Sequence, residues 1–286
     1  MNKIIIENNI VKYKELDDSI IFNYSVSDTF DSVYNLEIKC LNSTDLCINY
    51  NITNDIKINV LFEFEDNVVS NIFEKYNDGL LKIKNTYNLK SFSEVNVQKI
   101  YDVKEIKQND IVNLNGKKSS FYYILKTISI NPERYGLVIN HNAPYTVSNI
   151  INNAVNICDG SVFFDVIGNV PKGIIECSLN QNNRIVTFNK KKCQINPNLL
   201  IDEDNVIAEH SAFIGKFNDE DLFYLQSRGI TYEETIKLLI KGFLFSNLKL
   251  TEQDTGDLEN IIHKYWRWKN ESWRFSNVKT WYYIFW

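Results

Sequence analysis

The residues best suited to chemistry are three neighbouring polar side chains, Glu209, His210 and Ser211, in the run VIAEHSAFI. Neutral imidazole is a good ligand for iron, and its charge state is adjustable near neutral pH. The run is typical of a β-strand, whose alternation sends Glu209 and Ser211 to one side and His210 to the other. Two interpretations follow. His210 is either a metal ligand or a histidine at the edge of the core that bonds a backbone carbonyl.

The remaining histidines and the cysteines offer weaker chemistry. His141, in NHNAPYT, and His263, in LENIIHKYW, lack a cysteine or carboxylate at a metal-binding spacing, so we expect both to be structural. The five cysteines are widely spaced and contain no CxxC pair, which favours reduced thiols over a disulfide framework. They are Cys40, Cys47, Cys158, Cys177 and Cys193. The chain has no P-loop, dinucleotide-binding, HExxH or GxSxG motif, so we do not expect an ATPase or hydrolase activity within it.

The chain changes character near residue 217, where helix signals replace strand signals. Asn218 is placed as an N-cap before three acidic residues, and Arg228 followed by Gly229 predicts the end of that helix. Thr231 and Glu234 form a capping box at the start of a second helix. Both helices have an apolar face, made of Leu222, Phe223 and Leu225 in the first and of Ile236, Leu239, Ile240 and Phe243 in the second. The simplest interpretation is a helical hairpin packed on its own domain.

The preceding part of the chain, from Ile20 to about Ile207, reads as many short strands. Runs such as KINVLFEF and TISI alternate with period two, which predicts strands with one buried face. Asn-rich interruptions are typical of tight corners, because Asn tolerates left-handed backbone. The pattern indicates an all-β core and leaves a sandwich, a barrel and a β-helix open.

The run EHSAFIGKFNDEDLFYLQSRGI, which contains the polar triplet and the first helix, resembles the C-terminal signature of the SufB/SufD family. Members of this family are scaffold subunits of the SUF iron–sulfur cluster assembly system. The resemblance covers roughly the last third of the chain well and the first part only in general character, as expected for β-helix rungs with weak local signals.

The resemblance implies an all-β core that is a right-handed parallel β-helix, followed by a C-terminal helical segment. It divides the chain into a β-helix core at 1–215, a helical segment at 216–266 and a Trp-rich tail at 267–286. Open ends of such a stack need protection, so we expect the helices after Asn218 to cap the lower end. Family members often carry a further N-terminal helical domain, which this chain is too short to contain in full.

The resemblance also implies roles for the polar triplet. A His at the position of His210 is implicated in cluster formation at the interface of two paired scaffold subunits, with Glu209 and Ser211 as supporting residues. SufB-type members have Glu where this chain has Ser211, and they carry a sulfur-accepting Cys, whose thiolate is the usual acceptor, roughly thirty residues upstream. This chain has Asn182 and Asn183 in that region. It therefore looks SufD-like, a supporting subunit without catalysis of its own.

The implied partners are a SufC-like ATPase and a SufB-like scaffold or a second copy of this chain. The exposed candidates for docking the ATPase are Asp219, Glu220, Phe223, Tyr224, Gln226, Arg228 and Tyr232. No cofactor is expected to be stably bound, and a transient iron–sulfur cluster at a subunit interface is the expected cargo. ATP-driven closure of the ATPase would then pull on the scaffold pair.

Composition excludes some other classes. A net charge of −5 and a pI near 5.4 argue against a general nucleic-acid binder. The short basic run 190–192 is expected to be a solvated turn. The N-terminus has only three consecutive Ile residues, too few for a secretory signal or a spanning helix, so we expect a cytoplasmic protein without a membrane partner.

Two further hypotheses and one unusual segment remain. The chain could be a stand-alone β-helix enzyme that acts on polysaccharide, although such enzymes need clustered carboxylates and the acids here are scattered. It could also be a SufB-like acceptor that uses Cys177 or Cys193. All five Trp residues fall after Tyr265, where they are expected to pack on the body, on a partner or at a membrane surface.

Overall fold

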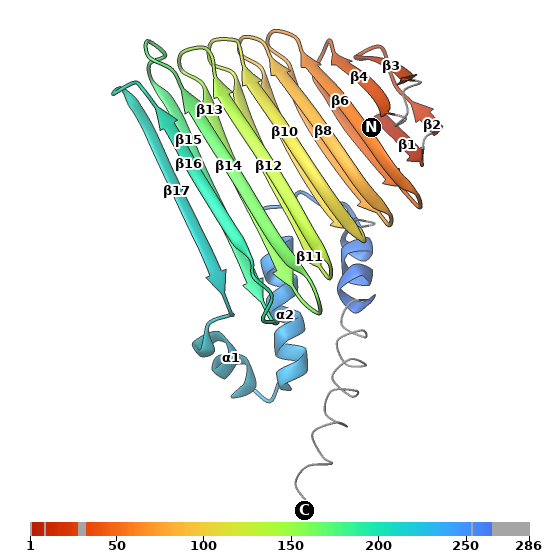
Figure 1. The fold of residues 1–286 in the computed structure, drawn as a ribbon, viewed down its shortest axis with the longest axis vertical. Coiled ribbons are helices and arrows are strands. Elements are labelled where there is room, and N and C mark those ends of the chain that lie inside the picture. The colour runs from red at the N-terminus through yellow and green to blue at the C-terminus, as the bar shows by residue number, and fades with distance from the viewer. Residues whose placement is uncertain (1, 9, 28–32, 253, 265–286) are drawn as a thin grey trace, which may run out of the picture.

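The computed structural model describes residues 2–8, 10–27, 33–252 and 254–264, so the Trp-rich tail lies outside the described residues. Two long sheets form the body (Figure 1). In spatial order, sheet A contains β17 (Val206–Gly215), β15 (Cys177–Thr187), β13 (Val147–Asn156), β11 (Ser120–Ser129), β9 (Glu94–Asp102), β7 (Val69–Asn77), β5 (Thr44–Asn51), β1 (Asn2–Glu7) and β2 (Ile10–Glu15). Sheet B contains β16 (Gln194–Ile201), β14 (Ser161–Val170), β12 (Pro132–His141), β10 (Glu105–Leu114), β8 (Leu80–Leu89), β6 (Asp55–Phe64), β4 (Val33–Cys40) and β3 (Ile20–Ser27).

From β4 onward the chain alternates between the two sheets, and each strand pairs in parallel with the strand two places further on. Thr44 is in register with Ser70, and Ser120 with Val147, so a turn takes about 26 residues. The two antiparallel pairs, β1 with β2 and β3 with β4, lie at the N-terminal end of the stack. The prediction of a parallel β-helix core is confirmed.

In-register stacking explains why the core has columns of similar side chains. Successive residues of a strand point to opposite faces, so one set of alternate residues enters the interior. Tyr50, Tyr76 and Tyr101 stack there with ring centroids 4.5 and 4.6 Å apart. All three are buried. The stack places large apolar area in the interior at a low cost in conformational entropy.

Helices follow the last strand as predicted, namely α1 (Asp219–Gln226), α2 (Tyr232–Phe245) and a further helical run at 254–264. Asn218 caps α1 by accepting a hydrogen bond from the backbone N–H of Glu220 at 3.2 Å. Thr231 and Glu234 form the predicted capping box of α2. Both helix starts were therefore readable from the sequence.

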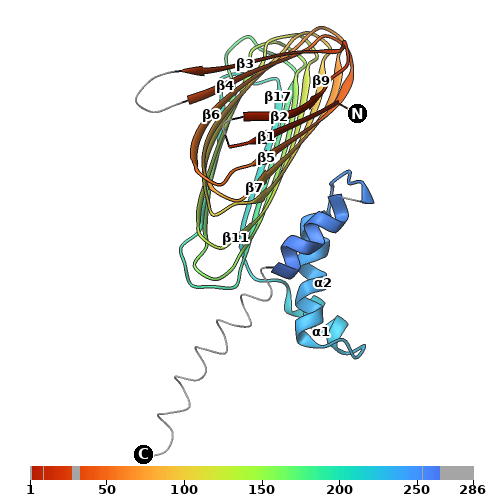
Figure 2. The same ribbon diagram turned by 90° about the vertical axis from the view of Figure 1, so that its right-hand side faces the viewer.

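The position of the helices differs from expectation. They lie along the outer face of sheet A and do not cover the end of the stack (Figure 2). Ile236, Ile240 and Leu244 of α2 pack against apolar residues that point outward from sheet A, including Ile128 and Val155. Ile128 and Val155 are outward positions near the C-terminal ends of β11 and β13, and they give the apolar face of α2 a packing surface on the side of the stack. The expectation of a lower cap is wrong.

Ion pairs connect the last helical run, 254–264, to the same outer face of sheet A. Lys75 of β7 forms ion pairs with Asp254 and with Asp257, the latter at 2.8 Å. Lys264 forms an ion pair with Asp102 of β9 at 2.9 Å. The helices are thus bound to the turns in the middle of the stack, and β16 and β17 are left at its end.

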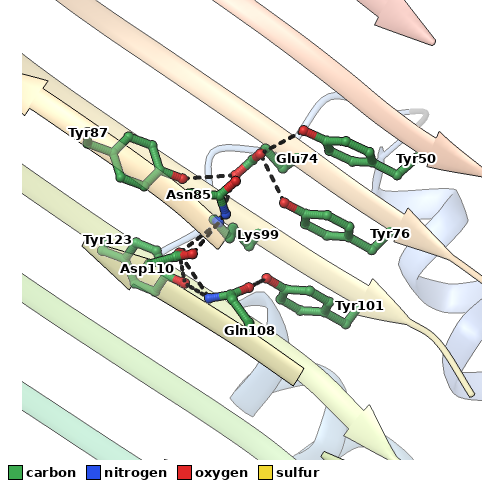
Figure 3. A network of polar contacts seen from close by, with 10 residues as sticks. All are labelled: Tyr50, Glu74, Tyr76, Asn85, Tyr87, Lys99, Tyr101, Gln108, Asp110 and Tyr123. Carbon is green, nitrogen blue, oxygen red and sulfur yellow. Dashed lines mark hydrogen bonds and ion pairs between the residues drawn. The ribbon is translucent and has the colours of Figure 1, made fainter. Parts of the chain in front are cut away.

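The interior also contains a completely buried ion network (Figure 3). The Lys99 Nζ lies 3.0 Å from Glu74 Oε2 and 2.9 Å from Asp110 Oδ2. Neutral side chains supply the remaining hydrogen bonds to the two carboxylates. The donors are Tyr50, Tyr76 and Tyr87 to Glu74, and Asn85, Gln108 and Tyr123 to Asp110. Buried charges are tolerated when they are paired and hydrogen-bonded in this way.

Replacing Lys99 by Met should lower the free energy of unfolding by roughly 3–5 kcal/mol, because two carboxylates would remain buried without a cation. Urea unfolding followed by circular dichroism measures the change. Lys104→Met is the matched control, since its ion pair with Asp78 is exposed and is worth less than about 1 kcal/mol. An equal effect of the two substitutions would contradict the assigned role of the network.

Candidate functional site

The polar triplet lies on β17, the last strand of sheet A. One edge of β17 pairs with β15, and the other pairs with no strand among the residues that the structure describes. Glu209, His210 and Ser211 are all exposed. The strand also exposes Ile207, at 68%, and Phe213. An unpaired strand edge with apolar side chains is a template for pairing with another chain.

Register shows which way the His210 side chain points. His210 is in register with Gln181 of β15, and Gln181 is buried. Residues in register on neighbouring parallel strands share a face, so His210 is on the face that continues the interior, at the open end of the stack. Glu209 and Ser211 are on the outer face. The predicted separation of the triplet therefore holds.

The interior beneath His210 is polar. Asn183 and Gln181 are buried there, with Asn152 donating to Asn183 Oδ1 at 2.7 Å and Gln181 donating to the backbone oxygen of Asn198 at 3.4 Å. The Gln181 Oε1 and Asn183 Nδ2 atoms have no hydrogen-bond partner among the described residues. Buried polar atoms are normally paired, so these two atoms are exceptions at this end of the interior.

The geometry limits what His210 can do alone. Within the described ranges, no group of three or more His, Cys, Asp or Glu side chains is placed to hold a metal ion. A single exposed imidazole can contribute one ligand, and any further ligands must come from another molecule. The arrangement therefore suits a shared site at an interface better than a site inside one chain.

The two cysteines of the acceptor hypothesis are poorly placed for sulfur chemistry. The buried Cys177 has its Sγ 3.2 Å from Thr146 Oγ1. Cys193 is half-buried, with its sulfur accepting a hydrogen bond from Asn156 Nδ2 at 3.0 Å. Burial raises the pKa of the Cys193 thiol, which disfavours the reactive thiolate. Asn182 and Asn183, which occupy the region of the SufB-type acceptor, are in register with Ser211 and Ala212.

His141 and the basic run are placed as expected. His141, at the end of β12, is buried and bonds Thr146 and Ser148 at 2.7 and 3.0 Å. Burial lowers its pKa to about 4. His263 is exposed on the helical run 254–264. The residues at 190–192 are in the bend between β15 and β16, where Lys191 pairs with Asp159.

All the residues predicted to dock an ATPase are at the surface. They are Asp219, Glu220, Phe223, Tyr224, Gln226, Arg228 and Tyr232. The Arg228 guanidinium lies 4.0 Å from the centroid of the Tyr224 ring. One sequence prediction needs correction. Phe223 was assigned to the apolar packing face of α1, yet it is 75% exposed, because Leu222 is the side chain that contacts the α2 cluster.

Buried ionisable groups are what sequence reasoning missed. Glu74, Lys99 and Asp110 lie at inward positions of their strands, and so does Glu133 of β12. The sequence did contain a sign of these residues. In IFEKY, the charged Glu74 alternates with Ile72 and Tyr76, which places it on the same inward face of the strand. Burial raises the pKa of the Asp110 carboxyl although Lys99 is adjacent. The Glu74 and Asp110 carboxylates are inaccessible to a polysaccharide, so they give no support to the enzyme hypothesis.

On the outer face of sheet A, burial lowers the pKa of Lys126 to about 7, with Arg184 as a second cause. Its Nζ lies 3.3 Å from Ser246 Oγ, just after α2. This lysine is thus covered by the helical segment. Within the described residues, no helix has both the length and the apolar character needed to cross a membrane.

Comparison with known proteins agrees with these features. Residues 91–243 match the family described as the SUF system FeS cluster assembly, SufBD core domain. The chain is 35% identical over 113 residues to the iron–sulfur cluster assembly protein SufD of Bacillus subtilis, covering 39% of this chain and 26% of that protein. It is 33% identical over 115 residues to SufB of the same organism, covering 38% and 24%. A SufBD family protein of Staphylococcus haemolyticus is 32% identical over 115 residues, again covering 38% and 24%. The matched segment spans about a quarter of the length of these relatives.

Glu133 should make stability depend on pH. Its carboxylate accepts hydrogen bonds from Thr127 and Tyr135 at 2.9 and 2.8 Å, and burial raises its pKa from 4.5 to about 7. Between these values the unfolded chain has released the proton that the folded chain retains, so stability falls as pH rises through this window. The total fall is about 3 kcal/mol.

Urea unfolding of the wild type and of Glu133→Gln at several pH values isolates this effect. The amide keeps the shape and an acceptor atom without titrating, so the difference between the two proteins should change between pH 4.5 and 7 and then level off. Parallel stability curves would show that Glu133 does not titrate in this range.

Proposed function

Because this chain belongs to the SufB/SufD family of the SUF system, we propose that it is a SufD-like scaffold subunit that pairs with a SufB-like subunit, or with a second copy of itself, and docks a SufC-like ATPase. The observation that carries the proposal is the free edge of β17, which presents His210 at the open end of the β-helix. In this role the chain assembles and positions other subunits and carries out no bond-making step of its own.

The pairing surface is the end of the stack. Strand β17 has one edge whose backbone groups pair with no other described strand, and its neighbour β16 exposes Leu200. A strand of a second scaffold added at this edge would satisfy the backbone groups and cover Ile207 and Phe213. The helices leave this edge free because they pack on the outer face of sheet A.

The ATPase surface is α1 and the start of α2. The first helix has no buried residue, and Phe223, Tyr224 and Tyr232 are exposed together with the acidic first turn. Exposed aromatic side chains of this kind are typical anchors of protein interfaces. Only the short link 216–218 connects the β17 strand to the surface on α1. Movement of the ATPase could therefore reach the scaffold interface directly.

The cargo is an iron–sulfur cluster held transiently between the paired scaffolds. His210 supplies one imidazole ligand, and the partner subunit supplies the others. Asn183 and Gln181 line the interior next to it. Because Asn occupies the region of the SufB-type acceptor Cys, the sulfur-accepting thiolate belongs to a SufB-like partner in this proposal.

Co-expression with a SufC-like ATPase and a SufB-like scaffold, followed by affinity purification and size-exclusion chromatography, tests the two surfaces separately. Phe223→Asp should weaken ATPase binding by about tenfold or more and leave the scaffold pair intact. Ile207→Asp should release the SufB-like subunit and retain the ATPase. Each substitution places a charge where the proposal requires an apolar contact.

Matched controls are exposed residues of the same kind on other parts of the molecule. Phe92→Asp changes an exposed Phe at a corner of the β-helix, and Ile21→Asp changes an exposed Ile of β3. Both control proteins should keep the complete complex. A wild-type chain that elutes alone in the presence of both partners would refute the scaffold function.

Loss of the imidazole should affect cargo without affecting assembly. After anaerobic reconstitution with iron and sulfide, His210→Ala should reduce the visible absorbance and the iron content of the complex at least severalfold, because one ligand is removed. His263→Ala, on the exposed helical run, is the control and should retain both. Equal iron content in the two variants would exclude His210 as a ligand.

A further inference from the structure

The outer face of sheet B carries a row of cations in exact alignment across four strands. Lys57 of β6 is in register with Lys82 of β8, Lys82 with Lys107 of β10, and Lys107 with Arg134 of β12. Lys84 lies one position further along the same face of β8. The helices pack on sheet A, so they leave this face uncovered (Figure 2). We call these five residues the basic row.

This alignment is unfavourable within the isolated chain. Neighbouring strands are about 4.8 Å apart, so the four aligned cations fall within about 14 Å. Like charges directly opposite each other on neighbouring strands destabilise a sheet. A row of aligned asparagines on the same face shows an alignment that is favourable instead. Asn88, Asn113, Asn140 and Asn169 are also in register and form amide hydrogen bonds at 2.8, 2.9 and 3.5 Å.

Three lysines of the basic row have no carboxylate partner among the described residues, whereas Lys57 has an interaction of its own. Lys82, Lys84 and Lys107 form no ion pair with any residue that the structure describes. Asp55 and Glu105 lie on the same face, two positions before Lys57 and Lys107, and no ion pair joins either of them to the row among the described residues. The positive charge of Lys82, Lys84 and Lys107 is therefore available to a ligand.

The face is hollowed at the same place. A depression of about 270 Å³ is lined by four cations of the row and by two amides, Asn59 and Asn109. A larger one of about 620 Å³ adjoins it and shares Asn59 and Lys84. Together they form a groove across β3, β4, β6, β8 and β10, and Glu37 is also part of its lining. Its cations can pair with anionic side chains, and its amides can bond a peptide backbone.

The lining residues favour an acidic peptide over a nucleic acid in this groove. Single-stranded nucleic acids need a series of aromatic rings for base stacking. Among the described residues, the lining of the groove supplies one aromatic side chain, Tyr24, and the outward Phe163 beside the row contacts the Arg134 guanidinium at 5.3 Å. An extended peptide places alternate side chains about 6.8 Å apart on one face, which lets acidic residues reach successive cations.

We propose that the basic row and its groove bind an extended acidic segment of a protein partner. This surface is on the opposite side of the β-helix from the helices, so it is distinct from the proposed ATPase surface and from the β17 edge. A third protein could therefore bind while the scaffold complex is assembled.

Fluorescence anisotropy with a fluorescein-labelled peptide of alternating Glu and Ser residues tests the proposal on the full chain. The peptide should bind, and affinity should fall as salt is raised because exposed charges are screened. The double variant Lys82→Gln/Lys107→Gln should bind roughly tenfold more weakly. The matched control Lys12→Gln/Lys104→Gln removes the same charge from exposed lysines outside the row and should bind as the wild type does.

Three results would overturn the proposal. The first is no binding of the peptide at low salt. The second is an equal loss in the two double variants, which would show attraction to surface lysines in general. The third is tighter binding of a labelled oligothymidylate than of the peptide, which would make the groove a nucleic-acid site. Circular dichroism of both double variants confirms that a loss of binding is not a loss of fold.

Discussion

The in-register stacking of parallel turns is the constraint on which the rest of this structure depends. Each strand places its side chains over the equivalent side chains of the turn before, so whatever one position carries is repeated along a column. Apolar and aromatic columns, such as Tyr50, Tyr76 and Tyr101, give the body its stability. The same stacking aligns asparagines into an amide ladder, which is stabilised by hydrogen bonds. It also aligns cations into the basic row, where like charges repel each other.

A stack of this kind contacts only its neighbours, so its ends have a different environment from its middle. The middle turns bury a charge network around Lys99 and receive the helices on their outer face. The last turn has neither. Among the described residues, one edge of β17 pairs with no strand, the buried amides beneath it have atoms without a partner, and His210 is exposed at the opening of the interior. A scaffold that pairs with another chain needs an end of this kind, where a strand edge is available for pairing.

The apolar residues on the outer face of sheet A determine which parts of the surface the helices cover. Ile128 and Val155 on the outside of sheet A attract α2, and the helical segment then covers Lys126. Sheet B has cations and amides at its outward positions and remains open. Three surfaces therefore stay separate, namely the strand edge, the aromatic side of α1 and the basic row. This separation would let one chain hold several partners together.

The sequence by itself determined the alternating strands, the helix caps at Asn218 and Thr231, and the family signature around His210, because each depends on residues close together in the chain. Through the family signature it also predicted the β-helix. Only the tertiary structure decided the register between the turns of the β-helix. That register pairs Lys99 with Glu74 and Asp110 and aligns the basic row. The packing of α1 separately decided that Phe223 is exposed. The tertiary structure also moved the helices from the end of the stack to its side. The Lys99 network and the basic row join residues on different strands, and the period-two pattern alone does not specify which strand lies beside which.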